Sequence, residues 1–444
     1  MAEFLNYPFD PELFSYNWQN EKDPVLTAIV ESGAVVESAE INRLISAGSD
    51  YYTLPVYKPL TGNPVNYDGQ TDILINEPEG GAQNGIVFGR ANSWKSRDFI
   101  VDYNSGADPM KQITSQVAKY WQKRRQSVLL TILDAVFGVS AEGWNDHKTN
   151  IAVAAGSTPT SDNKLGASSI SDAAVDAIGD ASDNISLAIM HSRVAGNLAN
   201  LQLLDYWKYT DPQGIEKKLR LADYNGMTVV IDDGVPVSKS VKTAGVYELT
   251  ISTAAVATDT FTILGKTYTW VANGTEETDT TIALPSTSTA ANQASAIVTK
   301  LGTIPGYTAT ASSSKITFTQ STSAPDAEAI TVSTTGTMKA AVVTATAPEY
   351  NKEYTTYGLG FGSILKGNAS VKNPAEVGRN SLEDGGYDYL VTRLRETLHP
   401  NGFGFVKPES YTSSPTDEML GNSSNWRIKT NHKNIYMVKI VSNG

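Results

Sequence analysis

The feature that most limits how this chain can fold is a long stretch whose composition differs from that of the rest. Within residues 243–348 roughly half of the residues are Thr, Ser or Ala, and no arginine occurs between Arg220 and Arg379. An apolar strand-like run at 227–231 precedes the stretch, and an aromatic, Gly-rich run at 354–361 follows it. Insertions are tolerated where exposed chain ends lie close together. We therefore predict that residues 243–349 form a domain inserted into a host domain.

A hairpin signal argues that this stretch is folded, although its composition leaves open a disordered, mucin-like stalk. A two-residue type II′ turn at 265–266 would place four apolar side chains on one face of a hairpin. The expected cross-strand pairs are Ile263 with Tyr268 and Phe261 with Trp270.

Further signals in the stretch are an apolar helical stripe at 294–301 that ends at Gly302, and strand patterns at 307–311, 315–319 and 329–333. They predict a small α+β module with the order ββα, followed by more strands.

Composition excludes several classes of function. The formal net charge of -12 argues against broad electrostatic binding of nucleic acid or an anionic membrane by the chain as a whole. The absence of cysteine excludes disulfides, thiolate metal sites and thiol catalysis. No apolar run has the length of a membrane span, and the first residues do not resemble a signal peptide. We expect a protein that folds in the cytosol, in two or three domains.

The first hundred residues are predicted to lack a core of their own. Residues 1–50 read as a loosely held arm in which aromatic side chains alternate with polar residues and proline, with a short helix at 23–30. Residues 51–105 read as an extended, two-stranded excursion with strand-like runs at 51–57, 73–75, 86–88 and 98–101. Such segments are marginal alone and need another surface on which to lie.

The clearest single element is a helix over residues 109–137. Asp108 can cap it, Pro109 suits the first helical position, and Gly138 ends it. One buried face is expected from the three-four spacing of Met110, Ile113, Val117, Tyr120, Trp121, Val128, Ile132 and Val136. A basic cluster in mid-helix consists of Lys119, Lys123, Arg124 and Arg125. We expect it to be a solvated face that forms ion pairs, with a nucleic-acid contact as the alternative.

The remaining pattern predicts an α+β domain with a mixed or antiparallel sheet. Its first part would contain a helix at 171–178, a strand at 185–190, a helix at 193–204 capped by Ser192, and a strand at 227–231. After the inserted stretch, strands are expected at 354–359, 387–396, 402–406 and 435–441.

Signals for chemistry are weak. The four histidines, His147, His191, His399 and His432, are far apart in sequence and none has a ligand partner at metal-binding spacing. The glycines at 358, 360 and 362 resemble part of a phosphate-binding loop, but a short irregular segment is expected after them where that loop needs a helix. Residues 232–234 read as a turn, because the alternating ligands of a calcium loop are missing. We predict no catalytic, cofactor-binding or metal site, no cofactor, and no enzyme.

The order of these parts, together with several short stretches, resembles the major capsid proteins of tailed bacteriophages, which share the Johnson fold. The resemblance covers about residues 1–240 and 350–444. The stretches that carry it are 54–58, 108–110, 178–192, 230–236, 354–362, 395–403 and 434–444.

The resemblance implies an α+β capsid fold. In that fold the segments would be an N-terminal arm (1–50), an extended loop (51–105), a peripheral domain with the spine helix (106–169), the first part of an axial domain (170–242), the inserted accessory domain (243–349) and the remainder of the axial and peripheral domains (350–444).

It further implies that the chain self-assembles as pentamers and hexamers into an icosahedral head that encloses phage DNA, in a virion assembled in the bacterial cytoplasm. The implied partners are further copies, a portal, a separate scaffolding protein, decoration proteins and non-specifically contacted DNA, with no membrane. The inserted domain would project outward. Two alternatives remain: a nanocompartment shell of the same fold, and a surface adhesin or tail component.

Overall fold

A computed structural model of the 444-residue chain describes residues 3–4, 7–8, 29, 32–46, 48–57, 63–68, 70, 72, 80–97, 109–210, 216–384 and 386–444. The chain folds into two compact units. Unit 1 comprises Met1–Asn150, Leu165–Pro236 and Thr355–Val441. Unit 2 comprises Ile151–Lys164, Val237–Tyr354 and Ser442–Gly444.

Five α-helices of unit 1 are α3 (Ala39–Ser46), α5 (Pro109–Phe137), α6 (Ser169–Ile178), α7 (Ser192–Asn200) and α9 (Asp417–Gly421). Its short 3-10 helices are η1 (Trp144–His147), η3 (Gly179–Asn184), η4 (Ser423–Asn425) and η5 (His432–Asn434).

A mixed sheet forms the centre of unit 1. Its strand order is β7-β27-β21-β8-β11-β10-β9, where β8 runs parallel to β11 and antiparallel to β21. The bounds are β7 (Lys148–Asn150), β8 (Ile185–Met190), β9 (Asp205–Thr210), β10 (Glu216–Tyr224), β11 (Met227–Ile231), β21 (Glu349–Gly360) and β27 (Met437–Ser442).

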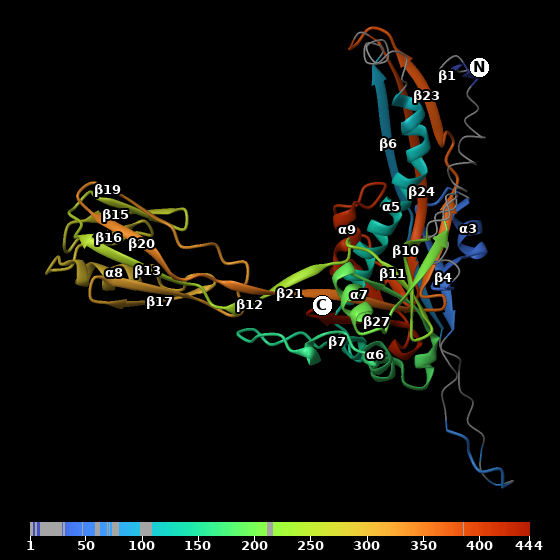
Figure 1. Cartoon of the computed structure of the whole chain (residues 1–444), viewed down its shortest axis with the longest axis horizontal. Helices are drawn as coiled ribbons and strands as arrows, with labels where there is room; N and C mark the ends of the chain where they lie inside the picture. Colours follow the sequence, from blue (N-terminus) through green and yellow to red (C-terminus); the bar gives the residue numbers. More distant parts are fainter. Residues whose placement is uncertain are drawn as a thin grey trace. The chain divides into compact units, whose positions relative to one another are not determined.

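A second sheet of unit 1 has the order β23-β24-β22-β3, and β6 also pairs with β24. Its bounds are β3 (Val35–Glu37), β6 (Phe88–Arg97), β22 (Ile364–Ala369), β23 (Ala375–Asn380) and β24 (Tyr387–Pro400). Helix α5 lies along β6 and β24 (Figure 1). Two-stranded pairs complete the unit: β1 (Glu3–Phe4) with β2 (Tyr7–Pro8), β4 (Tyr51–Tyr57) with β5 (Gly80–Ile86), and β25 (Phe403–Phe405) with β26 (Trp426–Ile428).

Helix α5 spans the predicted residues, but its burial is not that of a single face. Tyr120 is 40% exposed, so its expected place on the buried face is wrong. Beyond Ser127 nearly every side chain is buried, and only Asp134 is exposed. A helix that is apolar on nearly all sides belongs inside a core. This half of α5 packs in the main core of unit 1, while Trp121 packs with Leu390 in a smaller cluster.

Several elements of unit 1 differ from the sequence expectations. The helix expected at 193–204 ends at Asn200, and its N-cap is His191, whose Nδ1 accepts a hydrogen bond from the backbone N–H of Arg193. Strands β9, β10, β22 and β23 were not predicted. Their sequences alternate poorly or contain glycine and charged residues, so pairing with neighbours stabilises them more than their own propensity does.

The expected strand at 51–57 is β4, and its pairing with β5 from Tyr51↔Ile86 to Tyr57↔Gly80 gives the base of the predicted two-stranded excursion. The run expected at 86–88 is interrupted at Val87, where β5 ends and β6 begins. The predicted helix at 23–30, the predicted strands at 73–75 and 98–101 and most of the arm lie outside the described residues. Among the helices in the described ranges, none is both long and apolar enough to cross a membrane.

Unit 2 contains two four-stranded sheets with the orders β17-β18-β13-β20 and β16-β15-β14-β19. Its elements are β12 (Val237–Thr243), β13 (Val246–Thr253), β14 (Thr260–Ile263), β15 (Lys266–Val271), β16 (Thr281–Ala283), α8 (Ala290–Leu301), β17 (Tyr307–Ser312), β18 (Lys315–Gln320), β19 (Val332–Thr335), β20 (Lys339–Thr346) and the 3-10 helix η2 (Ser161–Asn163). A hydrophobic core whose buried residues all lie between 247 and 338 packs the two sheets and α8 together. The Thr-rich stretch is thus folded and is not a stalk.

The hairpin in unit 2 forms with a register different from the one predicted. Its turn residues are Leu264 and Gly265, both with positive φ (48° and 75°), so the turn is of type I′. Phe261 therefore pairs with Tyr268, and their rings stack at 5.2 Å between centroids. The shift moves each partner by two residues. Because strand side chains alternate, the four predicted apolar side chains still share the buried face.

Candidate functional site

The structure brings two of the four histidines together. His147 is fully buried, and its Nδ1 lies 2.7 Å from the carbonyl oxygen of Met437, to which it donates as Nδ1–H. Its Nε2 faces Nδ1 of His432 at 3.4 Å. The ring also stacks on Trp144 at 4.4 Å. Burial lowers the pKa of His147, which favours its neutral form.

The two rings are not joined by further ligand side chains, since nowhere in the described part of the chain do three or more His, Asp or Glu side chains form a group that could hold a metal ion. The pair was missed from sequence because 285 residues separate its members, and the contact arises only where η5 meets η1.

The other two histidines have structural hydrogen bonds, as expected. His191 caps α7 and lies 3.7 Å from the carboxylate of Asp233. His399 is 1% exposed, and its Nε2–H donates to Oε1 of Gln83 at 3.1 Å. Oε1 of Gln83 also accepts the backbone N–H of Gly402, so the amide joins β5 to the end of β24.

His399 should make the protein less stable in acid. Burial lowers the pKa of His399 to about 4 from its usual value near 6.5. The unfolded chain binds this proton near pH 6.5, whereas the folded protein does not until about pH 4, so the stabilisation is complete above pH 6.5 and is lost as pH falls through this window. We expect the free energy of unfolding to drop by roughly 3 kcal/mol across it. Urea denaturation in a pH series measures how steeply the free energy of unfolding changes with pH. In His399→Gln this slope should decrease by the contribution of one proton. His191→Gln is the control, and equal slopes for both variants would contradict the assignment.

The glycines at 358, 360 and 362 do not form a phosphate-binding loop. Gly358 and Gly360 lie within β21, and the segment after them, expected to be irregular, is the strand β22. A Cβ on Gly360 would lie 2.6 Å from the carbonyl oxygen of Asn184 and 2.6 Å from Cβ of Tyr436. Close packing of the sheet therefore accounts for Gly360, whereas Gly362 lies after β21 with a positive φ of 66°.

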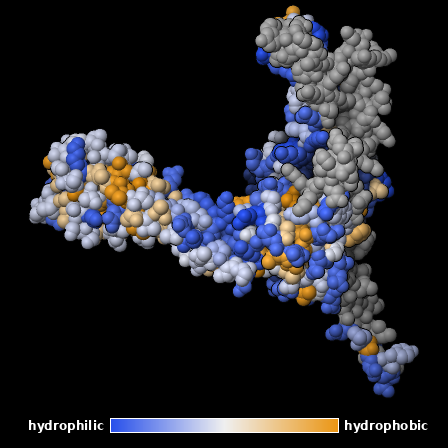
Figure 2. Space-filling model, in the orientation of Figure 1, coloured by the Kyte–Doolittle hydropathy of each residue, from blue (hydrophilic) through white to orange (hydrophobic). Residues whose placement is uncertain are grey.

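In the basic cluster of α5 the two arginines form ion pairs, while no described carboxylate pairs with Lys119 or Lys123. Arg124 forms an ion pair with Asp417 of α9, which also binds Arg90 at 2.7 Å. Arg125 is buried and contacts the carboxylate of Glu396 on β24 at 2.6 Å. The surface over α9 is hydrophilic in Figure 2. The expected ion pairs exist, but Arg125 lies in the interior and is not part of a solvated face.

A polar cluster ties the start of β4 to the segment after β25. The carboxylate of Asp50 accepts hydrogen bonds from the hydroxyl of Tyr411 at 2.5 Å and from Nζ of Lys407 at 3.2 Å. Nζ of Lys407 lies over the rings of Tyr51 and Tyr411, 4.8 and 4.5 Å from their centroids. The hydrogen bond from Tyr411 holds the pKa of Asp50 below its usual value. The base of the β4–β5 pair is thus fixed on unit 1.

Comparison with known proteins gives one relative over nearly the full length. The chain is 21% identical over 431 residues to the major capsid protein of Bacillus phage SPP1, covering 97% of this chain and 94% of the relative. No protein-family model matches the chain.

Two solved structures can be compared with the chain, both with a TM-score below 0.5. The capsid of Ralstonia phage GP4 has a TM-score of 0.47 and 7% identity, covering 94% of this chain and 88% of that chain. The capsid of Helicobacter pylori bacteriophage KHP30 has a TM-score of 0.40 and 10% identity, covering 95% and 92%. Over nearly its full length, the sequence of the chain is similar to that of a phage major capsid protein.

Proposed function

We infer that this chain is a major capsid protein that forms the head of a phage. The observation that carries the inference is the end-to-end similarity to the SPP1 capsid protein, which leaves little of either chain unmatched. The protein is a structural component of the virion, is not an enzyme, and has further copies of itself as its partner.

The copies would assemble as hexamers and pentamers of an icosahedral shell around the phage DNA. Support comes from the β4–β5 pair, whose base is fixed to unit 1 by the Asp50 cluster. A two-stranded segment gains little stability alone, and unit 1 covers this base, where Tyr52 and Leu54 are buried with Ile41 and Ile45 of α3. From this base the extended loop of the proposed fold would reach a neighbouring subunit. The division of the chain into arm, extended loop, peripheral domain and axial domain belongs to the same proposal.

Residues 243–349 would be an accessory domain inserted into the capsid fold and projecting outward, where it stabilises capsomers or contacts the host surface. The chain enters and leaves this stretch on paired antiparallel strands, with Val237 opposite Tyr354 and Thr243 opposite Glu349. The stretch also has a core of its own. Both features are those of a separable domain.

A portal, a separate scaffolding protein and decoration proteins would be further partners, and packaged DNA would be contacted without sequence preference. The net charge of -12 fits a wall that does not hold DNA tightly.

Sedimentation of the purified protein tests the assembly. We expect closed shells of megadalton mass, visible by electron microscopy. A stable monomer or trimer would contradict the shell and favour the adhesin or tail alternative. Shells that contain a cargo enzyme, encoded away from terminase and portal genes, would favour the nanocompartment alternative.

Removal of the proposed inserted domain should leave assembly intact. Because Thr243 and Glu349 are cross-strand neighbours, an Asn-Gly turn can replace residues 244–348 without moving β12 or β21. We expect shells of this variant in electron micrographs, with less density on the outer surface. The unmodified chain, expressed in parallel, is the control. A soluble variant that forms no shells would contradict a peripheral role for the domain.

A further inference from the structure

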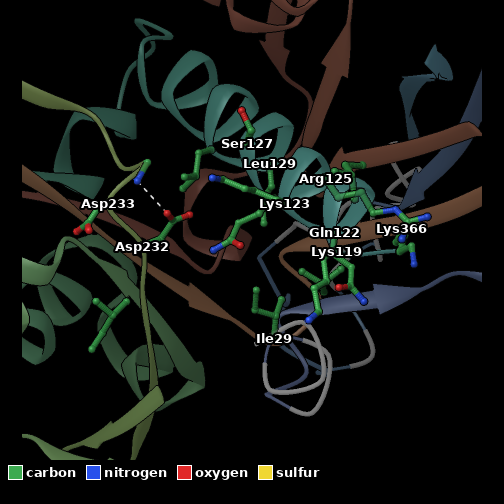
Figure 3. Close-up of a pocket in the computed structure, with 16 residues that line it drawn as sticks. Ile29, Lys119, Gln122, Lys123, Arg125, Ser127, Leu129, Asp232, Asp233 and Lys366 are labelled. Atoms are coloured by element: carbon green, nitrogen blue, oxygen red, sulfur yellow. Dashed lines mark hydrogen bonds between the residues drawn. The ribbon is translucent and has the colours of Figure 1, made fainter. Parts of the chain in front are cut away.

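A pocket of about 680 Å³ lies in unit 1 between the middle of α5 and the turn after β11 (Figure 3). Its helix side carries Lys119 and Lys123, and β22 adds Lys366. Asp232 and Asp233 lie on the opposite side. The apolar part of the lining comprises Ile29, Val35, Leu129, Leu130, Ile231 and Leu398.

The basic side of the pocket has two lysines, Lys119 and Lys123, that form no ion pair with a described carboxylate. Arg125 is already paired with Glu396, and Lys366 has the carboxylates of Glu396 and Glu37 nearby, although it forms no ion pair with either. Lys366 is partly buried, and burial, together with the nearby guanidinium of Arg125, lowers its pKa. An anionic group entering the pocket would relieve this unfavourable environment.

The two carboxylates on the acidic side each accept a hydrogen bond from a backbone N–H of this chain. Oδ1 of Asp232 accepts the backbone N–H of Gly234 at 2.8 Å, the hydrogen bond drawn in Figure 3. Oδ1 of Asp233 accepts the backbone N–H of Ser192 at 3.1 Å, at the start of α7. Asp232 faces the pocket, whereas the side chain of Asp233 is turned toward the start of α7. Both carboxylates at this edge would repel the continuous negative charge of a nucleic-acid backbone.

We propose that this pocket binds an acidic segment of another polypeptide, with its carboxylates against Lys119, Lys123 and Lys366 and its apolar side chains on the leucine-rich lining. Separate carboxylates interspersed with apolar side chains match a pocket that is basic on one side, apolar in its lining and acidic opposite. A phosphate backbone satisfies only the first of these. The inference goes beyond the proposed function, because the pocket is lined by residues of unit 1 alone and does not depend on assembly into a shell.

Fluorescence anisotropy of the purified full-length chain tests the site directly. The probe is a fluorescein-labelled peptide of alternating Glu and Leu, and the comparison peptide has Gln in place of Glu. We expect saturable binding of the acidic peptide that weakens with added salt. In the double variant Lys119→Glu and Lys123→Glu, binding should weaken about tenfold or more. The matched control is Lys372→Glu with Lys433→Glu, two exposed lysines elsewhere in unit 1, and it should bind like the unmodified chain.

Lysine acylation read by mass spectrometry keeps the test valid if a variant folds poorly. On the unmodified chain, the bound peptide should protect Lys119, Lys123 and Lys366, and leave Lys372 and Lys433 reactive. The proposal is overturned if the Gln peptide binds equally well, if a DNA duplex displaces the acidic peptide with equal affinity, or if protection falls on the control lysines. Peptide binding is measured on the chain whether or not it assembles. Failure to form shells would therefore contradict the proposed function without contradicting this site, and loss of peptide binding would do the reverse.

Discussion

Replacing Glu396 with Gln is expected to lower the free energy of unfolding of unit 1 by about 3 kcal/mol. Glu396 is 1% exposed and contacts Arg125, whose side chain is 10% exposed, at 2.6 Å. Lys366 lies near the same carboxylate. Without the carboxylate, the buried guanidinium of Arg125 loses its ion-pair partner and lies beside the partly buried ammonium of Lys366. Urea denaturation of the purified variant measures the loss.

Two controls separate burial from simple loss of an ion pair. Glu376 forms an exposed ion pair with Arg393 at 3.0 Å, so Glu376→Gln should cost at most about 0.5 kcal/mol. The double variant Arg125→Met with Glu396→Leu should recover most of the loss, because a buried pair can often be exchanged for apolar residues. Equal losses for Glu376→Gln and Glu396→Gln would show that the buried network is not what stabilises this region.

Elements with strong local signals could be predicted from the sequence. Helix α5 runs from Pro109 to Phe137, where the proline and the following Gly138 mark its ends. Strands β8 and β11 have the predicted bounds, because each is a short apolar run between turn residues. These signals act within a few residues, so no tertiary information is needed to read them.

Predictions failed where the deciding contacts come from elsewhere in the chain. Strand β22 has little strand propensity, but it is paired on both sides, with β24 and with β3. The hairpin register was wrong by two residues, because either turn leaves the same side chains on the buried face and periodicity cannot distinguish them. A type I′ turn matches the twist of the strands, although Leu264 must adopt positive φ.

The candidate sites also depend on contacts between distant parts of the chain, which the sequence alone does not show. The basic cluster of α5 was visible in the sequence, but the sequence could not show which of its members would be buried. Arg125 is buried against Glu396, a residue far along the chain, whereas Lys123 is exposed. The pocket also needs Lys366 and the turn at Asp232, which only the fold brings to α5.

The second large effect is expected from Gly360→Val. A side chain at this position would meet the carbonyl oxygen of Asn184 and Cβ of Tyr436, each 2.6 Å from the new Cβ. Both neighbours belong to the packed sheet region, so the strand itself must move. We expect the free energy of unfolding to fall by about 3 kcal/mol or more, measured by urea denaturation, or the variant to be insoluble.

The control is a glycine whose replacement should raise the stability of the protein. Gly196 lies inside α7, and a Cβ there would have no atom within 4 Å. Gly196→Ala should therefore raise stability by about 0.5–1 kcal/mol, since glycine is unfavourable in a helix interior. If Gly360 instead served a phosphate loop, its replacement would abolish binding of inorganic phosphate while stability stayed close to that of the unmodified chain. The two interpretations of the same glycine spacing thus predict opposite outcomes in one denaturation experiment. A stable Gly360→Val variant would rule out sheet packing as the reason for this glycine.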